Sequence, residues 1–373
     1  MDRINEYVMK TLLYFVSKIT DSGGVSRVLS LKVNFLADVL GYKVHIISTN
    51  DTQQLPFFCF SDKVKIHFSE IKVNGFMSLL ELKKESKKKI NEIQPDIVLV
   101  TDNGIKGLFI REWVPDSIPC IYELHASPKH FYKTGYQGIK KYMNNFFIDK
   151  YLSKYQRVVV LRDEFVLPDI NVSKQLVIPN PLSFNVENDN ILNHKKAIAV
   201  GRLISLKGYD RLLSGWKKIT DKHPEYVLEI FGEASEEYDI HEVIASYNLQ
   251  KNVYVFPPTT QIKKKYLEAN FLLHGSFSES FGMVFLEAMQ CCLPIVYYND
   301  IGNGDFLNKR NSFGVTNEEE FVGAVDTLIT NSILRKEMGQ NAKQTSDLYK
   351  LEIIMSYWDA LFREIKYPKR YKS

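Results

Sequence analysis

Residues 279–287, with the sequence ESFGMVFLE, combine two carboxylates with a glycine turn. Glu279 precedes the turn. Glu287 lies in a predicted helix among apolar residues, so its carboxylate must face solvent or be held by a partner. Gly282 leaves backbone N–H groups free at the start of that helix, where anions bind readily. The segment therefore indicates an anion-binding site that also offers carboxylate acceptors.

Residues 201–208, with the sequence GRLISLKG, form a second candidate site between a predicted strand and a predicted helix. Arg202 supplies a planar fork of donors and Lys207 a compact charge, and together they suit a pyrophosphate. Two solvated charges on a loop would also fit this segment when it is considered by itself.

A third candidate is the glycine pair Gly23-Gly24, between the first predicted strand and a helix. Glycine lets the backbone approach a ligand closely, and a helix N-terminus favours anionic groups. An ordinary turn fits the pair equally well, because neither the G-x-G-x-x-G pattern nor a P-loop occurs in the chain.

These residues stand at the ends of short apolar runs that alternate with amphipathic stretches of helical length, a pattern that predicts β-α-β units and parallel sheets. In the first half, strands are predicted at 11–16, 43–48, 96–101, 120–124 and 157–161, and helices at 25–40, 77–93 and 137–154. In the second half, strands are predicted at 197–200, 226–231, 253–256, 271–274 and 294–297, and helices at 207–219, 236–247, 260–269 and 283–292.

The fold class that follows is α/β, with two doubly wound, Rossmann-like parallel-sheet domains. A turn-rich connector at 178–193 separates them, so we place the domains at residues 1–185 and 186–349. Ligand is expected in the cleft between them, at the carboxyl ends of the strands. A tail helix at 350–366 is expected to pack back on the first domain. Its predicted buried stripe comprises Ile354, Tyr357, Trp358, Leu361 and Phe362.

Composition excludes several classes of protein. Of the 373 residues, 45% are hydrophobic and 25% charged, which is ordinary for a globular protein. The four cysteines form no disulfide or zinc pattern. We interpret Cys291 and Cys292 as buried packing residues in a protein of the reducing cytosol. No run approaches the roughly 18 apolar residues of a membrane span. The net charge of +4 is too small to indicate nucleic acid as a partner.

The chain resembles the retaining glycosyltransferases of family 4, which belong to the group 1 glycosyltransferases and have the two-domain GT-B fold. The resemblance covers nearly the whole chain, and five motifs in the family's order carry it. They are the Glu-x7-Glu signature from Glu279 to Glu287, the Gly-Arg…Lys-Gly loop from Gly201 to Gly208, the glycine loop Gly23-Gly24, the strand ending Asn180-Pro181, and His125 after the strand 120–124.

The resemblance implies a role for each of these residues. Arg202 and Lys207 would bind the nucleotide diphosphate and stabilise the leaving group. Glu279 would contact hydroxyls of the transferred sugar, and Glu287 those of the ribose. His125, in the acceptor-binding first domain, would lie near the sugar. The other implied donor-binding residues are Gly23, Gly24 and Gly201, with the backbone of Phe281, Gly282, Met283 and Val284.

We expect no metal and no other cofactor, because the Asp-x-Asp motif of metal-chelating glycosyltransferases does not occur in the chain. Fixed cations can stabilise the charge that develops on a departing diphosphate. Retention would require attack on the face from which the leaving group departs, with a donor phosphate oxygen taking the acceptor's proton. Asp305 stands where the family often has Glu, and the family's neighbouring Pro is absent, which leaves the donor sugar open. UDP is the expected nucleotide.

The charge is unevenly distributed: residues 1–185 hold 25 basic and 19 acidic residues, whereas residues 186–373 hold 23 and 25. The basic stretch 82–89 and the aromatic and basic region 130–147 fit a solvated face, an acceptor wall or a surface for anionic lipid. We expect a cytoplasmic enzyme, peripheral on the inner face of the cell membrane. It would add a hexose or N-acetylhexosamine to a glycan acceptor, lipid-linked, in surface polysaccharide or lipopolysaccharide synthesis. A non-catalytic nucleotide-sugar-binding protein and an epimerase or phosphorylase of the same fold remain alternatives.

Overall fold

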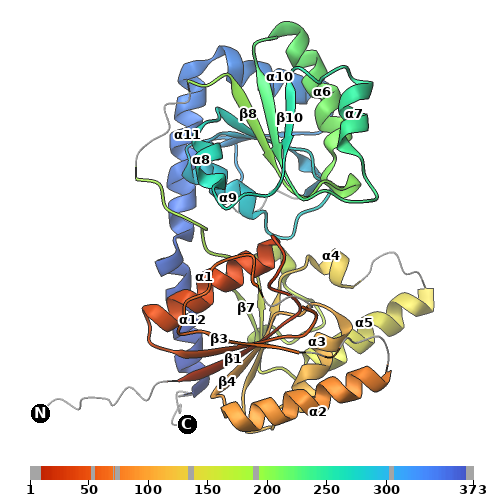
Figure 1. The fold of residues 1–373 in the computed structure, drawn as a ribbon, viewed down its shortest axis with the longest axis vertical. Helices are drawn as coiled ribbons and strands as arrows, with labels where there is room; N and C mark the ends of the chain where they lie inside the picture. The colour runs from red at the N-terminus through yellow and green to blue at the C-terminus, as the bar shows by residue number, and fades with distance from the viewer. Residues whose placement is uncertain are drawn as a thin grey trace, which may run out of the picture. The chain divides into compact units, whose positions relative to one another are not determined.

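The computed structural model describes residues 10–51, 55–69, 71, 76–132, 138–187, 193–301 and 306–366. The chain forms two compact units (Figure 1). Unit 1 comprises Met1–Pro181 and Leu351–Ser373, and unit 2 comprises Leu182–Lys350. The C-terminal segment of the chain therefore returns to the unit in which the chain begins.

The described part of unit 1 contains a sheet of seven parallel strands in the order β3-β2-β1-β4-β5-β6-β7. The strands are β1 (Thr11–Val16), β2 (Lys43–Ser48), β3 (Lys65–Phe68), β4 (Ile97–Val100), β5 (Cys120–Leu124), β6 (Arg157–Val160) and β7 (Gln175–Val177). The five predicted strands are present to within one residue at either end. β3 and β7 were not predicted, because β3 is a half-exposed edge strand and β7 has three residues, so neither shows a buried apolar run.

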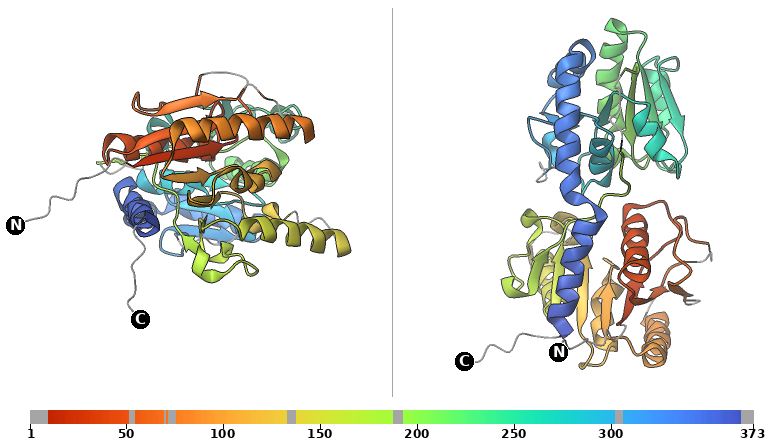
Figure 2. Two further views of the ribbon diagram at one scale, coloured as in Figure 1. Left: turned by 90° about the horizontal axis from the view of Figure 1, so that it is seen from below. Right: turned by 90° about the vertical axis from the view of Figure 1, so that its left-hand side faces the viewer.

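Six helices accompany this sheet within the described residues, and five of them cover its two faces (Figure 1). They are α1 (Gly24–Asp38), α2 (Phe76–Ile93), α3 (Ile105–Ile110), α4 (Pro128–Phe131), α5 (Gly138–Leu152) and α12 (Leu351–Lys366). α1 and α12 lie side by side on one face, and α2, α3 and α5 lie on the other (Figures 1 and 2). This arrangement follows from right-handed crossovers, since the strand order runs in opposite directions from β1.

The tail helix α12 packs against α1, and four of the five residues of its predicted buried stripe are buried. Ile354, Trp358, Leu361 and Phe362 are buried as predicted. The prediction was wrong for Tyr357, whose side chain is 51% exposed, whereas Met355 is fully buried. The helix turns about 100° per residue, so position 355 lies closer than 357 to the stripe of 358 and 362.

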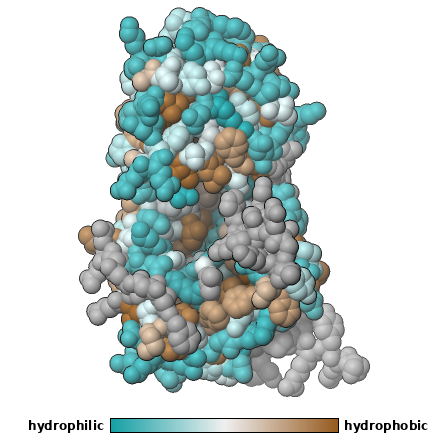
Figure 3. All heavy atoms as spheres, turned by 90° about the vertical axis from the view of Figure 1, so that its right-hand side faces the viewer, coloured by the Kyte–Doolittle hydropathy of each residue, from teal (hydrophilic) through white to brown (hydrophobic). Residues whose placement is uncertain are grey.

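α5 exposes an apolar strip on the surface of unit 1. Tyr142, Met143 and Phe146 have exposed fractions of 73%, 65% and 61%. Their spacing of one, three and four residues places them on one face of the helix. Figure 3, which shows the right-hand side of Figure 1, has hydrophobic residues exposed among hydrophilic ones on this unit.

In the described residues of unit 2, six parallel strands form a sheet in the order β10-β9-β8-β11-β12-β13. The strands are β8 (Lys196–Val200), β9 (Val227–Phe231), β10 (Val253–Phe256), β11 (Phe271–His274), β12 (Ile295–Tyr298) and β13 (Ser312–Val315). The helices are α6 (Tyr209–Lys222), α7 (Ile240–Ser246), α8 (Ile262–Leu267), α9 (Met283–Gln290), α10 (Glu318–Thr330) and α11 (Ser332–Ser346). The elements expected up to residue 297 are present, while β13, α10 and α11 were not predicted.

Three helices of unit 2, α6, α7 and α8, begin later than predicted, and the first two do so for clear local reasons. Gly208 adopts a left-handed conformation with φ of 62°, so Lys207 lies in a short 3-10 turn and α6 begins at Tyr209. The Asp239 side chain accepts hydrogen bonds from the backbone N–H groups of His241 and Glu242, which caps α7 at Ile240.

The core of unit 2 lies between its sheet and the helices α6, α7 and α10, around the fully buried Trp216 and Phe321. Cys291 and Cys292 are buried free cysteines, which confirms the packing interpretation. Among the helices of the described chain, none combines the length and the hydropathy that crossing a bilayer requires.

Candidate functional site

Two loops meet at the carboxyl edge of the unit 2 sheet, where β8 and β11 end. A Cβ atom on Gly208 would lie 2.0 Å from the carbonyl oxygen of Gly275, so only glycine permits this approach. The backbone N–H of Phe277 donates to the carbonyl of Leu206 at 2.9 Å. The loop that carries Lys207 is thereby fixed beside the end of β11.

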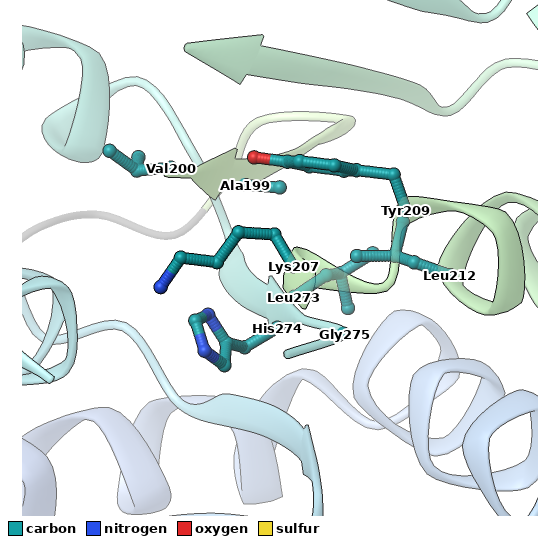
Figure 4. Close-up of a pocket in the computed structure, with 8 residues that line it drawn as sticks. All are labelled: Ala199, Val200, Lys207, Tyr209, Leu212, Leu273, His274 and Gly275. Atoms are coloured by element: carbon teal, nitrogen blue, oxygen red, sulfur yellow. The ribbon is translucent and has the colours of Figure 1, made fainter. Parts of the chain in front are cut away.

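Lys207, His274 and Glu279 form a cluster at this edge. The Lys207 Nζ donates to Glu279 Oε1, and His274 Nε2 lies 2.9 Å from the same oxygen. Figure 4 shows the Lys207 and His274 side chains converging beside the ring of Tyr209, whose hydroxyl donates to the Gly201 carbonyl at 2.8 Å. The predicted residues Gly201, Lys207 and Glu279 therefore do come together, with His274 as a partner that was not predicted.

The cluster keeps Glu279 ionised. Burial would raise the pKa of Glu279, but the Lys207 ammonium and His274 outweigh it and hold this pKa well below its usual range. Burial lowers the pKa of His274, although Glu279 opposes that shift. We infer that a neutral His274 donates its Nε2–H to the carboxylate at neutral pH.

One oxygen of Glu279 is left for a ligand. Both basic partners contact Oε1, and Oε2 has no hydrogen bond to any of the residues that the structure describes. The side chain retains an exposed fraction of 11%. A carboxylate of this kind can accept a charge-assisted hydrogen bond from a hydroxyl group.

The N-terminus of α9 adjoins Glu279. Gly282 has φ of 81° and is the N-cap of the helix, and a Cβ atom there would lie 2.4 Å from the Phe285 ring. The first turn of α9 contains no acidic residue that would occupy the N–H groups of Met283 and Val284. The Phe281 side chain packs on Phe306, so its backbone is the part that a ligand could contact. This geometry suits an anion such as a phosphate.

Glu287 is held inside the unit by its own partners. Its exposed fraction is 3%. Ser183 Oγ donates to one carboxylate oxygen at 2.7 Å, and the Tyr266 hydroxyl lies 3.2 Å from the other. Each carboxylate oxygen can accept a second hydrogen bond, so these contacts still permit a ligand hydroxyl to bind.

Arg202 is exposed and, within the described residues, makes no ion pair, so it does not join the Lys207 cluster. Arg211, which was not predicted, instead fastens the loop after β11. Its Nε donates to the Gly275 carbonyl and its Nη2 to the Ser276 carbonyl, each at 2.7 Å. The guanidinium stacks between two aromatic rings, and these contacts keep the loop rigid.

The glycine pair of unit 1 lies at the start of α1. Gly23 is the N-cap, and its N–H donates to Asp21 Oδ1 at 3.1 Å, while Ser26 donates to the same oxygen at 2.6 Å. Gly24 is exposed as the first residue of the helix. The Asp21 side chain therefore stabilises the turn, and the exposed backbone of the turn is available to a ligand.

His125 follows β5 at the carboxyl edge of the unit 1 sheet. Its backbone N–H donates to the Asn103 side chain at 2.8 Å. Its Nε2 lies 3.2 Å from Glu123 Oε2, and Lys32 Nζ lies 2.6 Å from that same oxygen. This buried group was not predicted as a unit, although a glutamate within the buried strand CIYEL is a signal that could have revealed it.

Asp305 and its neighbours 302–304 lie outside the described residues. Across the described ranges, no group of three or more His, Cys, Asp or Glu side chains is placed to hold a metal ion.

Residues 185–345 match the model of the family described as Glycosyl transferases group 1. This segment covers most of unit 2, including Lys207, Glu279 and Glu287. An uncharacterized glycosyltransferase of Haemophilus influenzae is 27% identical over 95% of this chain and 100% of its own length. The amylovoran biosynthesis glycosyltransferase AmsD of Erwinia amylovora is 25% identical over 94% of this chain and 99% of its own. Together they support a glycosyltransferase activity for this chain.

The crystal structure of HepE of Anabaena in complex with UDP and glucose superposes with a TM-score of 0.71 and 18% sequence identity. It covers 95% of this chain and 99% of HepE. At this identity the likeness concerns the fold. The two parallel-sheet α/β units are those of the GT-B glycosyltransferases, as predicted.

Proposed function

We propose that this chain is a retaining glycosyltransferase of family 4 that transfers a hexose or N-acetylhexosamine from a UDP-linked donor to a glycan acceptor. The observation that carries the proposal is the ionised Glu279 carboxylate, held by Lys207 and His274 with Oε2 left for a ligand. Such a carboxylate suits sugar hydroxyls, since it accepts charge-assisted hydrogen bonds in a partly water-excluded site.

Cleavage of a glycosyl–phosphate bond develops negative charge on the diphosphate, and fixed positive groups stabilise this charge. In the proposed reaction, Lys207 and the first N–H groups of α9 meet the phosphates. The exposed Arg202 can turn toward them without breaking a hydrogen bond to a described residue. These groups supply the charge compensation that a metal ion provides in other glycosyltransferases.

We propose that the acceptor attacks from the face on which the diphosphate leaves and that a donor phosphate oxygen takes its proton. No side chain is assigned as a general base. Glu279 orients the sugar, Glu287 accepts from the ribose hydroxyls, and the backbone at Gly23, Gly24 and Gly201 leaves space for the diphosphate. His125 contacts the transferred sugar, and Asp305 takes part in selecting it.

UDP as the nucleotide is supported by the HepE complex, which contains UDP and glucose. A role in surface polysaccharide or lipopolysaccharide synthesis is supported by the name of the Erwinia relative, which acts in amylovoran biosynthesis. We propose a cytoplasmic enzyme with a lipid-linked glycan acceptor.

The decisive experiment is an assay of nucleoside diphosphate release and sugar transfer with a panel of UDP, GDP and ADP sugars, with and without EDTA. We expect turnover of a UDP sugar that EDTA does not abolish, and NMR of the product should show the donor's anomeric configuration. Glu279→Gln should reduce turnover strongly while the protein still folds. Nucleotide-sugar binding without turnover would favour a non-catalytic binding protein, and loss of activity in EDTA would contradict the metal-free reaction.

The membrane part of the proposal concerns unit 1. Tyr142, Met143 and Phe146 of α5 are exposed, and α2 carries the exposed Lys84, Lys87 and Lys88. Apolar and basic side chains together suit the headgroup region of an anionic bilayer. The protein should therefore sediment with vesicles of phosphatidylglycerol at low salt, but not with vesicles of phosphatidylcholine. Phe146→Ser with Met143→Ser should weaken this binding, whereas Ile333→Ser, at an exposed residue of unit 2, should not.

A further inference from the structure

Lys32 is a lysine in the interior of unit 1. It lies in α1 with an exposed fraction of 2%. Its Nζ is 2.6 Å from Glu123 Oε2 and 3.5 Å from the ring centroid of Trp358 in α12. The ring of Tyr14, in β1, is 5.9 Å away. A lysine is rarely buried unless a partner holds its charge, and here the carboxylate and an aromatic face do so.

Glu123 connects this lysine to His125. Positions 123 and 125 lie two residues apart along β5 and its end, so their side chains share one face of the sheet. This face is the one that α1 and α12 cover (Figure 2). Both basic side chains contact the same carboxylate oxygen: Glu123 Oε2 lies 2.6 Å from Lys32 Nζ and 3.2 Å from His125 Nε2.

A purely structural ion pair explains this geometry poorly. Burying two charges usually costs about as much as their attraction returns, and apolar residues often stabilise a core equally well. Glu123 Oε1 is also buried and has no hydrogen-bond partner among the described residues. One carboxylate oxygen is thus unpaired, while Lys32 and His125 share the other. An ion pair that served stability alone would use both oxygens, so this arrangement favours a role in orienting His125.

We propose that Lys32, seated on Trp358, is a positioning residue for His125 that acts through Glu123. Glu123 accepts the Nε2–H of a neutral imidazole, which fixes the ring and leaves Nδ1 toward a ligand hydroxyl. Lys32 holds Glu123 in place and offsets part of its charge, so that the carboxylate oxygen stays directed at Nε2. The proposal rests on the proposed function insofar as that function places His125 at the transferred sugar.

The electrostatics of the surrounding groups agree with this arrangement. Burial would raise the pKa of Glu123, but Lys32 and His125 outweigh it and hold that pKa below its usual range. Burial lowers the pKa of Lys32, while Glu123 opposes the shift. Burial raises the pKa of Tyr14, which therefore stays neutral. The uncharged Asn103 side chain holds the backbone of His125.

The first test is NMR of the full chain labelled at histidine nitrogens, with His125→Ala to assign the His125 signals. In the wild type near pH 7, we expect the nitrogen shifts of a neutral ring protonated at Nε2. A ring protonated at Nδ1 would overturn the proposal without the need for any further variant.

The second test removes the lysine charge. Lys32→Met removes the group that holds Glu123 in place, so the His125 ring should lose its fixed hydrogen bond and its nitrogen shifts near pH 7 should move away from those of the wild type. Glu123→Gln with Lys32→Met removes both charges but keeps an oxygen that can accept the Nε2–H, so the nitrogen shifts should return toward those of the wild type. This double variant replaces the single one if Lys32→Met does not fold. Lys196→Met is the matched control, because it breaks a partly buried 2.7 Å ion pair with Glu229 in unit 2. Unchanged nitrogen shifts of His125 in Lys32→Met would overturn the proposal.

The third test is kinetic and separates positioning from stability. Lys32→Met should lower kcat about tenfold or more, because a displaced catalytic group loses its alignment, with little change in the donor KM. In a His125→Ala background the same change should have no further effect on kcat. An equal loss in both backgrounds would show that Lys32 acts independently of His125. If the NMR results hold but no nucleotide sugar is turned over, the proposed function fails and the Lys32–Glu123–His125 coupling stands.

Discussion

Glu279 accepts hydrogen bonds from two basic side chains that differ in kind. Lys207 provides a permanent positive charge, whereas His274 is buried and its pKa is lowered, so it contributes a neutral N–H donor. The carboxylate is consequently ionised and oriented without a second fixed cation beside it. Lys207 stays available to a phosphate group on its other side, because an ammonium has three donors.

At the residue scale, the first prediction concerns Arg202. Arg202→Ala should lower kcat about 100-fold or more, because a donor aimed at the charge of the transition state is typically worth that much. Stability should be unchanged, since Arg202 is exposed. Steady-state kinetics and thermal unfolding measure the two effects.

The control is Arg310→Ala, at an exposed arginine just before β13 and thus at the opposite edge of the sheet. Equal activity of the two variants would remove Arg202 from the proposed diphosphate site.

The second prediction concerns His274 and pH. Its pKa is lower in the folded protein than in the unfolded chain, so the unfolded chain binds the proton first as the pH falls below about 6.5. The free energy of unfolding should therefore decrease from pH 7 to pH 5. His274→Gln keeps an N–H donor but cannot titrate, so this decrease should become smaller by up to about 1.4 kcal/mol per pH unit.

Urea unfolding of both proteins at several pH values measures this slope. His45, whose pKa burial lowers to about 4, remains in both proteins and contributes a common background. Identical slopes would mean that His274 does not titrate differently in the two states.

At the element scale, the short helix α9 and the residues just before it bring three binding groups together. Glu279 precedes the helix, and the first N–H groups of the helix follow Gly282. Glu287 lies in the second turn, where its carboxylate contacts the hydroxyl of Tyr266 from α8. Phe285, directly beneath Gly282, packs against the ring of His274 at 4.6 Å between centroids. The helix, the carboxylate cluster and the turn therefore form one packed group.

Gly282→Ala should disturb this packed group. The left-handed backbone conformation costs a residue with a side chain about 1–2 kcal/mol. The new Cβ would also lie 2.4 Å from Phe285, so Phe285 and His274 must move. Both the free energy of unfolding and the affinity for UDP should decrease, as measured by urea unfolding and calorimetry.

Gly323→Ala in α10 is the matched control, since a Cβ there meets no atom within 4 Å. It should stabilise the protein by about 0.5–1 kcal/mol, because alanine is the better helix former. If both substitutions behave alike, the left-handed turn at Gly282 is not required.

At the scale of the whole molecule, the C-terminal helix completes the fold of the unit in which the chain begins. α12 buries Met355, Trp358 and Phe362 in unit 1, and its Asp359 accepts a hydrogen bond from Tyr42 at 2.6 Å. Glu364 of the same helix pairs with Arg157 of β6 at 2.7 Å. Unit 1 is therefore assembled from two segments that unit 2 separates in sequence.

Truncation after Lys350 should unfold unit 1. Burying a large apolar side chain contributes about 1.5–3 kcal/mol, so loss of the α12 stripe removes an amount comparable to the stability of a domain. Limited proteolysis should then digest residues 1–181 and leave 182–350, which has its own sheet and core. Resistance of both parts would contradict the role given to α12.

Ligand binding offers a prediction for the complete protein. UDP should raise the melting temperature more than GDP or ADP, because a ligand at 100 times its Kd stabilises the folded state by about 2.7 kcal/mol. The shift should be smaller in Glu287→Ala and unchanged in Lys196→Met. The largest shift with GDP would correct the nucleotide without affecting the glycosyltransferase assignment.

Much of the architecture could be predicted because buried parallel strands are continuous apolar runs, such as those of β1, β4 and β12. Elements with few buried apolar residues were not predicted. β3 is half exposed, and α11 is largely polar with a narrow buried stripe that includes Met338 and Ala342. The errors in the start of α6 and α7 have local causes. The left-handed Gly208 precedes α6 and the Asp239 side chain caps α7, and the periodicity of apolar residues reveals neither.

The sequence by itself determined the α/β class, the parallel strands, and the order of the glycine, basic and acidic motifs, because these depend on neighbouring residues. The tertiary structure decided which side chains meet. Lys207 and Glu279 are 72 positions apart, and Lys32 and Glu123 are 91 apart. Arg211 and Lys32 acquire their partners only when strands that are distant in sequence become neighbours in a sheet. Tyr266 meets Glu287 where α8 packs on α9, and His274 lies only five positions from Glu279. The distances between charged side chains and their burial set the charge states at these sites, and neither can be read from spacing along the chain.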